Sequence, residues 1–347
     1  MSDEQQVIKQ QTSKHQIEHA IQLLQNNDVV AMPTETVYGL AARIDSETAI
    51  KKIFSVKQRP FFDPLIVHVS SLEQAQKCTS DWNKMCDVLA KAFWPGPLTL
   101  VLAKSDLISD LITSGLPSVG LRWPQHKLAQ ELIRRAGVPL AAPSANKFGR
   151  TSPTKAQHVE TEFAGSVFVL DGDSSEIGIE STVLSIKKQG EIYQLAILRK
   201  GAVLKSQIQQ VLLQNPYKFE WSEQIDKKES PGHMKHHYMP SIPFVICQNQ
   251  NMKLSELTDL LNSKLHELPD EVEGVKLIKP KSVIKKIQFL KLSENPEQAA
   301  RELYSQLRSA SERAPDALCF IRTPAYQGEM WESVFDRLYK AASLILD

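Results

Sequence analysis

The sequence predicts an α/β protein with two domains, a twisted mixed sheet followed by a smaller open, largely parallel sheet of Rossmann-like type. Short apolar runs of strand length alternate with helical periodicities along the chain. A polar segment with prolines near both ends, at 215–240, divides the chain into two regions. The 347 residues, 42% of them hydrophobic, suffice for about two domains. We therefore expect domains over 10–214 and 241–347, joined by a linker at 215–240.

The first region mixes strands and helices without a strict βαβ repeat. Apolar residues recur at helical spacing near 14–25, and further helices are expected near 46–54 and 125–136, the last ending at Gly137. Strands are expected at 29–32, 65–69, 98–103, 119–123, 139–142, 167–170, 181–186 and 192–198. The last two strands are close enough in the chain to pair antiparallel, which favours a mixed sheet.

The second region alternates more regularly, which predicts a small parallel sheet. Its expected elements are a strand at 243–247, a helix around 257–265, strands near 275–278 and 287–290, a helix opening at 293–296, a strand at 317–321 and a final helix at 331–346. Neither GxGxxG nor the GxxxxGKS/T phosphate loop occurs in the chain.

Charge and cysteine usage limit the class of protein. The formal net charge of +1 produces no overall field for nucleic acid or membranes, although a local basic surface remains open. The four cysteines form no CxxC pair, which favours free thiols in a reducing cytosol over zinc or disulfides. The polar start has no signal-peptide pattern, and no apolar run approaches the ~20 residues of a membrane span. We expect a cytoplasmic protein without membrane association.

The stretch PTETVYGLAA, at 33–42, raises the first question about function. It follows an apolar run and presents small hydroxyl groups and one glycine where a strand should end. The pattern fits either a hairpin with polar side chains or the edge of a site for a small molecule.

Two further motifs contain side chains that suit phosphate binding. Lys57 and Arg59 would project to the same side of an extended segment and could clamp a polyphosphate, or they form an ordinary solvated basic turn. Ser144 and Asn146 leave an apolar strand, where ligands often bind in α/β sheets, or they form a simple turn.

Polar residues inside apolar strands form the last group. Ser181 and Thr182 open a strand after an acidic loop in which Asp171 and Asp173 could cap the backbone or approach Mg²⁺; caps are favoured. His68 is either a structural histidine or a site residue. Arg122 requires an anionic partner, because a buried unpaired guanidinium is costly.

In this order the motifs PTETVYGL, K-x-R-P, PLIVH, S-x-N, STV and LRKGA resemble the YrdC-like family of threonylcarbamoyl-AMP synthases, over about 17–202. SPG and HYxP within 230–240 resemble the longer two-domain form. The resemblance implies that L-threonine, bicarbonate or CO₂, and ATP are joined into threonylcarbamoyl-AMP with release of pyrophosphate. It further implies that the product serves N6-threonylcarbamoylation of adenosine 37 in tRNAs that read ANN codons.

The resemblance also implies roles for individual residues. Those expected to contact L-threonine are Thr36, His68, Arg122, Ala142 and Ser181. Those expected to contact ATP are Arg59, Asp63, Ser118, Ser144, Asn146, Ser152, Arg199 and Tyr238. Lys57 and Arg59 would act in catalysis, with Mg²⁺ entering with ATP and no metal site on the protein. The sequence departs from the family pattern at Asp63, where asparagine is common, and at His233, where methionine is common.

The resemblance extends to partners and to the linker. It implies hand-over of the product to the tRNA threonylcarbamoyl-transferase machinery and leaves room for weak RNA binding. The segment around Lys235–Tyr238 is too polar for a core and is expected to fold over the nucleotide as a lid. A metal site on His233, His236 and His237 is disfavoured, because no helix holds them and no acidic residue adjoins.

Two rival functions remain at this stage. A YrdC-like sheet could serve as an RNA-binding module, although the near-neutral charge and the lack of stacked aromatic motifs weigh against it. A carbamoyl-transfer maturation factor for metal-site proteins would usually contain acylphosphatase-like and zinc-finger segments, and neither is visible in this sequence.

Overall fold

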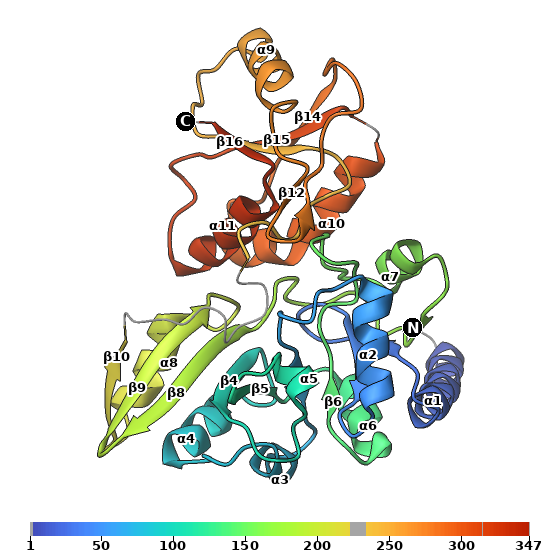
Figure 1. Ribbon diagram of the computed structural model, residues 1–347, viewed down its shortest axis with the longest axis vertical. Coiled ribbons are helices and arrows are strands. Elements are labelled where there is room, and N and C mark those ends of the chain that lie inside the picture. The colour runs from blue at the N-terminus through green and yellow to red at the C-terminus, as the bar shows by residue number, and fades with distance from the viewer. Residues whose placement is uncertain (1–2, 223–233, 314, 347) are drawn as a thin grey trace. The chain divides into compact units, whose positions relative to one another are not determined.

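The computed structural model describes residues 3–222, 234–313 and 315–346, which divide into two compact units (Figure 1). The first unit comprises residues 1–146, 153–176 and 180–233, and the second comprises 147–152, 177–179 and 234–347. Two short segments, 147–152 and 177–179, thus belong to the second unit although residues of the first unit flank them in the sequence. None of the helices in the described ranges is long and apolar enough to cross a membrane.

The first unit is built on a ten-stranded mixed sheet with the order β10-β9-β8-β4-β5-β3-β6-β2-β1-β7. Its strands are β1 (Val30–Met32), β2 (Gly39–Arg43), β3 (Ile66–His68), β4 (Leu98–Ala103), β5 (Ser118–Arg122), β6 (Leu140–Ala141), β7 (Phe168–Val169), β8 (Thr182–Gln189), β9 (Ile192–Arg199) and β10 (Lys218–Trp221). Its helices in the described part are α1 (Asp3–Gln25), α2 (Glu47–Lys57), α3 (Leu72–Lys77), α4 (Lys84–Phe93), α5 (Asp110–Thr113), α6 (Lys127–Ala136), α7 (Ala156–Phe163) and α8 (Lys205–Leu213).

Local signals explain where several of these helices begin and end. The Ser46 side chain accepts a hydrogen bond from the backbone N–H of Ala49 and so caps the start of α2. Helix α6 ends at Gly137, whose φ of 74° suits a residue without a Cβ. The antiparallel pairing expected of the last two strands of the first region is confirmed by β8 and β9.

The two faces of the large sheet are covered differently. On one face, apolar side chains such as Val67, Leu100 and Leu121 pack against α2 and α4 in one large hydrophobic core. On the other face, α1 and α6 cover only β1, β2, β6 and β7. The middle strands β3, β5, β4 and β8 therefore have one face outside both of these cores, and polar residues can occupy it.

The second unit has the open parallel sheet that the sequence predicted, with the order β14-β15-β11-β16. Its strands are β11 (Phe244–Cys247), β14 (Ile287–Leu290), β15 (Ala317–Ile321) and β16 (Leu344–Leu346), and its helices are α9 (Leu254–Lys264), α10 (Pro296–Glu312) and α11 (Glu329–Ala341). Helix α9 lies on one side of this sheet, and α10 and α11 lie on the other (Figure 1).

Two expectations for this unit were wrong. Residues near 275–278 do not join the parallel sheet; Val275 and Lys276 form strand β13, which pairs with β12 (Glu271–Val272) in a separate hairpin. The final helix ends at Ala341, and residues 344–346 form a strand beside β11 instead. The apolar sequence LIL suits a strand as well as a helix, and only pairing with β11 decides between them.

Candidate active site

The register of the sheet places several of the predicted site residues on one face. Strands β3 and β5 are parallel, and His68 lies directly beside Arg122. Because alternate residues of a strand share a face, Ser118 points to the same side as Arg122. Ala142 follows β6 and donates its backbone N–H to the Ile66 carbonyl (2.9 Å), so it lies at the same level of the sheet.

The same face continues across the neighbouring strands. Thr99 of β4 pairs with Val183 of β8, which in turn pairs with Arg199 of β9. The hydroxyl groups of Thr99 and Ser181 are 2.8 Å apart, and Arg199 Nη2 donates to Ser181 Oγ at 3.1 Å. Arg199 also donates to the Ser181 carbonyl, so the start of β8 is fixed in place on this face.

Arg122 has a buried carboxylate partner, Glu35, which the sequence analysis did not assign. Arg122 Nη2 lies 2.7 Å from Glu35 Oε1, and Glu35 Oε2 accepts the backbone N–H of Gln125 at 3.0 Å. Glu35 follows β1, whereas Arg122 ends β5, and strands β3, β6 and β2 lie between them in the sheet. The loop that follows β1 therefore brings the Glu35 carboxylate to Arg122.

His68 is buried on the same polar face and is held as a neutral imidazole. Its Nδ1 lies 3.3 Å from the Ile66 carbonyl oxygen. Burial, and then the charge of Arg122, lower the pKa of His68 to about 3. A side chain with so low a pKa can orient a substrate through hydrogen bonds but is a poor proton acceptor at neutral pH.

The PTET segment forms a compact hydroxyl-lined turn between β1 and β2. Thr34 Oγ1 donates to the Val37 carbonyl at 2.6 Å and lies 2.8 Å from Thr36 Oγ1. The backbone N–H of Thr36 also bonds to Thr34 Oγ1. Thr34 is therefore the residue that shapes the turn, and Thr36 is the buried hydroxyl beside it.

Lys57 joins the two residues of the S-x-N motif. It is the last residue of α2, and its buried Nζ donates to the backbone carbonyls of Ser144 and Asn146. Burial, and then the charge of Arg59, hold the pKa of Lys57 well below its usual range. The extended geometry expected for the K-x-R segment was wrong, because Gln58 has a left-handed backbone (φ 52°) that ends the helix.

Arg59 forms the second buried arginine–carboxylate pair of this unit. Its Nη2 lies 2.8 Å from the Asp63 carboxylate, and the two side chains are only 3% and 0% exposed. The guanidinium also donates to the backbone carbonyls of Asp63 and Pro64. A polyphosphate binding to Arg59 would share this cation with the Asp63 carboxylate.

Two of the residues expected to contact ATP, Ser152 and Tyr238, belong to the second unit. Tyr238 is 1% exposed, and His237 is buried as well. The expectation that this segment is too polar for a core was therefore wrong for these two side chains. The SPG motif and His233 lie outside the described residues.

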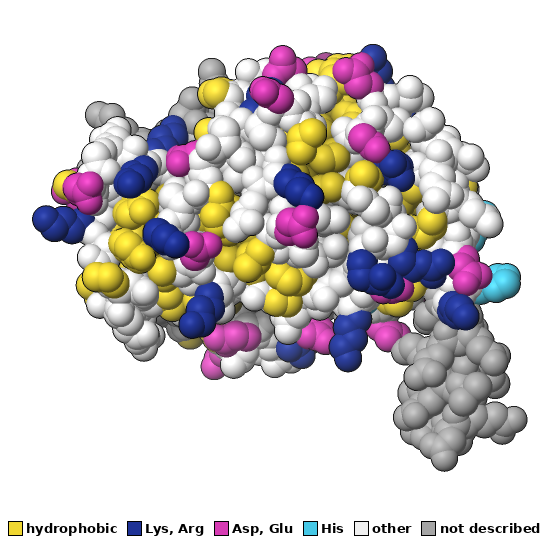
Figure 2. All heavy atoms as spheres, turned by 90° about the horizontal axis from the view of Figure 1, so that it is seen from below, with side chains coloured by type: hydrophobic (Ala, Val, Ile, Leu, Met, Phe, Trp, Pro, Cys, Tyr) yellow, Lys and Arg dark blue, Asp and Glu magenta, His cyan; other side chains and the backbone are white. Residues whose placement is uncertain are grey.

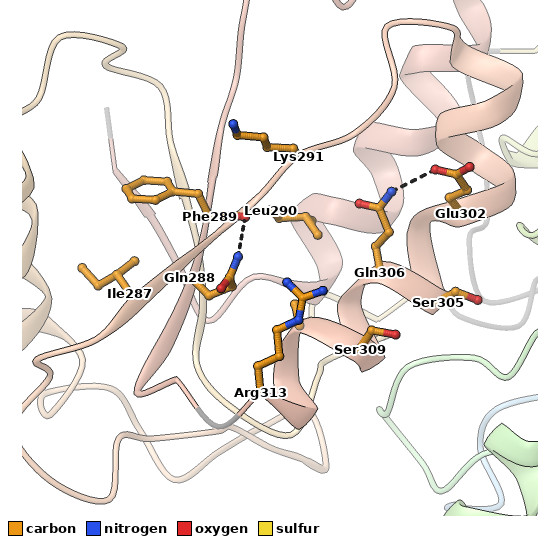
Figure 3. A pocket seen from close by; sticks show the side chains of 11 residues that line it. Ile287, Gln288, Phe289, Leu290, Lys291, Glu302, Ser305, Gln306, Ser309 and Arg313 are labelled. Atoms are coloured by element: carbon orange, nitrogen blue, oxygen red, sulfur yellow. Dashed lines mark hydrogen bonds between the residues drawn. The ribbon is translucent and has the colours of Figure 1, made fainter.

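The second unit also contains an open groove of about 660 Å³ between β14 and α10. Figure 3 shows Gln306 hydrogen-bonded to Glu302 along the helix, and the Gln288 amide bonded to the Phe289 carbonyl. None of the predicted site residues lines this groove, which is formed by residues 287–291, Glu302, Ser305, Gln306, Ser309, Ala310 and Arg313. The polar face of the sheet in the first unit remains the candidate site.

Surface charge gives little support to an extended nucleic-acid interface. On the face shown in Figure 2, Lys and Arg side chains are interspersed with Asp and Glu and with apolar side chains. A mixed distribution of this kind produces a weak net field toward phosphate backbones.

A mixed α/β sheet with buried cations and hydroxyl groups on one face is typical of the class of α/β proteins that bind small molecules. A family model described as "Telomere recombination" (Sua5_yciO_yrdC) matches residues 22–201. A second model, described as "Threonylcarbamoyl-AMP synthase, C-terminal domain", matches residues 203–343.

Known proteins resemble this chain over nearly its whole length. Threonylcarbamoyl-AMP synthase of Bacillus subtilis is 37% identical, with 95% of this chain and 94% of that protein covered. The Pyrococcus abyssi synthase is 33% identical, with 96% of each covered. The crystal structure of P. abyssi Sua5 complexed with L-threonine matches at a TM-score of 0.77 and 32% identity, covering 95% of this chain and 96% of that one. The chain belongs to the threonylcarbamoyl-AMP synthase family, in its two-domain form.

Proposed function

We propose that this protein synthesises threonylcarbamoyl-AMP and pyrophosphate from L-threonine, CO₂ or bicarbonate, and ATP. The observation that carries the proposal is the face of the sheet that Arg122, His68 and Ser181 share. Family membership supports the same activity, and the P. abyssi relative was solved with L-threonine. The roles of the individual residues below are part of this proposal.

Arg122 is the residue best suited to bind the threonine carboxylate. Among the described residues, Arg122 donates from Nη2 to Glu35 and from Nε to the Gly96 carbonyl, so its Nη1 stays available to a substrate. Glu35 holds the guanidinium in place and offsets its charge before substrate arrives. Thr36 and Ser181 supply hydroxyl groups for the threonine hydroxyl and amine, and Ala142 supplies an apolar contact.

The threonine amine has to be neutral to attack CO₂. The new C–N bond forms a carbamate, and the amine proton leaves to solvent. The neutral imidazole of His68 fits an orienting role here, because its low pKa makes it a weak base. A carbamate oxygen then attacks the α-phosphorus of ATP in line, the bond to the β-phosphate oxygen breaks, and pyrophosphate departs. Positioning and charge stabilisation supply the rate acceleration.

The nucleotide would lie against Lys57, Arg59 and the loop after β6. The other ATP contacts expected in the first unit are Ser144, Asn146, Ser118, Arg199 and Asp63. Phosphate oxygens near Lys57 favour its charged form and so raise its pKa again, which binds the triphosphate and the departing pyrophosphate. We expect Mg²⁺ to enter with ATP and to neutralise phosphate charge. The described residues include no group of three His, Cys, Asp or Glu side chains that could hold a metal ion, so phosphate oxygens and water are the expected ligands.

The product is a mixed carbamic–phosphoric anhydride, which needs a nucleophilic amine as its acceptor. We propose that the protein delivers it in the cytoplasm to the tRNA threonylcarbamoyl-transferase machinery, which modifies adenosine 37 of ANN-decoding tRNAs. RNA binding by this chain would be weak, in keeping with the mixed surface charge in Figure 2.

Pyrophosphate release from the purified protein tests the proposal. Release should require L-threonine, bicarbonate and ATP together, and it should need no RNA. Mass spectrometry of the quenched reaction should show threonylcarbamoyl-AMP. Release that is independent of threonine, or that depends on RNA, would contradict the proposed synthase activity and favour an RNA-directed role.

A further inference from the structure

The second unit contains a backbone pairing that joins two segments distant in sequence. The backbone N–H of Met239 donates to the Gly149 carbonyl at 2.8 Å, and Thr151 N–H donates to the Met239 carbonyl at 3.1 Å. Thr151 Oγ1 adds a bond to the Tyr238 carbonyl at 3.0 Å. Residues 149–151 and 238–239 therefore form one paired element, which lies next to Ser152 and includes Tyr238.

Glycines let this element and its neighbour approach the rest of the unit closely. Gly149 has a φ of +74°, and a Cβ at this position would lie 2.6 Å from Val275 Cγ1. Gly178 has a φ of +81°, and its Cβ would lie 2.4 Å from the backbone carbonyl of Arg301 in α10. Both the close contact and the positive φ exclude larger residues, so these segments are seated tightly on α10 and on the β12–β13 hairpin.

Tyr238 is held by its ring in an unfavourable backbone conformation. Its φ is +68°, which is uncommon for a residue with a Cβ. The ring centroid lies 4.1 Å from that of His237 and 5.5 Å from that of Tyr304, and the Arg337 guanidinium lies 6.0 Å from it. These contacts with α10 and α11 stabilise a conformation that the backbone alone disfavours.

Helix α10 contacts both halves of the paired element. Tyr304 packs on the ring of Tyr238, and Arg308, one helical turn later, donates from Nη2 to the Thr151 carbonyl. Residues four apart on a helix share one face, so a single face of α10 sets both segments. Arg337 of α11 lies near Tyr238 from a second helix.

We propose that Tyr304, Arg308 and Arg337 are positioning residues that hold Tyr238 and Ser152 in the geometry that receives ATP. The inference rests on the proposed function and assigns a task to α10 and α11, which is to fix the segments that contain Ser152 and Tyr238. Misplacement of such segments weakens nucleotide binding while leaving the threonine pocket intact.

Initial rates of pyrophosphate release, at varied ATP and at varied threonine, test this inference on the full-length chain. Tyr304→Leu should raise the KM for ATP about tenfold, with the KM for threonine changed less than about twofold. Arg308→Gln should act in the same direction but less. Tyr304→Phe keeps the ring and should restore the wild-type KM. Tyr339→Leu is the matched control, because this α11 tyrosine packs on Phe335 and is bonded by Arg322.

The outcomes are distinguishable. An unchanged KM for ATP in Tyr304→Leu and Arg308→Gln, with wild-type melting temperature, overturns the positioning role. An equal loss of kcat in Tyr304→Leu and Tyr339→Leu, with both KM values unchanged, assigns these tyrosines to stability alone and also overturns it. If Tyr304→Leu does not fold, Arg308→Gln decides, because this half-buried side chain can be changed without opening the core. Absence of pyrophosphate release by the wild type would instead contradict the proposed function.

Discussion

Two buried arginine–carboxylate pairs in the first unit have nearly the same geometry but different origins. Arg59 and Asp63 are four residues apart and meet at 2.8 Å within one loop. Arg122 and Glu35 are 87 residues apart and meet at 2.7 Å because the sheet and the loop after β1 bring them together. The first pair is a local property of the chain, and the second depends on the whole sheet. Under the proposed function, Asp63 would moderate a phosphate-binding cation, whereas Glu35 would position the arginine that binds threonine.

The largest effect is expected from breaking the long-range pair. Arg122→Ala removes the proposed carboxylate ligand and leaves Glu35 buried without its cation, so the KM for threonine should rise about a thousandfold. Stability should fall by about 3–5 kcal/mol. Initial rates at varied threonine measure the KM, and chemical denaturation measures the free energy of unfolding. The double variant with Glu35→Ala should recover stability without recovering threonine binding; recovery of both would contradict the assignment.

Lys57 differs from the two paired arginines, because its ammonium donates to two backbone carbonyls. Lys57→Ala should lower kcat about a hundredfold, since the charge that accumulates on the departing pyrophosphate loses a partner. The KM for threonine should stay within about twofold. Single-turnover rates at saturating threonine and ATP measure the change. If more threonine restored the rate of this variant, Lys57 would act on threonine binding, which would contradict its proposed role at the departing pyrophosphate.

His68 lies beside Arg122 of the long-range pair and should make the free energy of unfolding depend on pH. Its folded-state pKa of about 3 lies below the unfolded value near 6.5, so the unfolded chain binds the additional proton between these values. The contribution to stability is present above about pH 6.5 and is lost as the pH falls toward 3. Denaturation between pH 6.5 and 5 should show a slope about 1.4 kcal/mol per pH unit steeper in the wild type than in His68→Gln. Equal slopes would contradict the buried neutral imidazole.

The smallest effect is expected from the local pair. Asp63→Asn keeps the shape of the side chain and removes the charge that offsets Arg59, so the KM for ATP should fall about threefold. The protein without nucleotide should melt at a lower temperature, because Arg59 is then buried without a counter-charge. The increase in melting temperature on adding ATP should accordingly exceed that of the wild type. A smaller increase than in the wild type would show that Asp63 itself contacts the nucleotide favourably.

Regular periodicities made much of the fold predictable, and ambiguous segments did not. Strands 98–103 and 287–290 have the expected bounds, because their apolar runs are flanked by clear turn signals. Strand β2 (Gly39–Arg43) was missed because Gly39, Ala41 and Ala42 have little strand preference, and pairing with β1 and β6 imposes the strand. Strand β10 lies inside the expected linker and exists because it adds to the edge of β9.

The candidate site likewise has features that the local sequence determines and features that depend on distant contacts. The sequence by itself determined the residue types and their order in the motifs, because short motifs need no distant contact. It assigned Arg59 and Asp63 to ATP and did not predict their pairing, which the structure shows. Only the tertiary structure decided that Glu35 is the partner of Arg122 and that Thr99 meets Ser181. It also decided that residues 147–152 belong with the second unit. Such contacts depend on sheet register and on loop paths, which are set by packing over the whole chain and leave no local pattern.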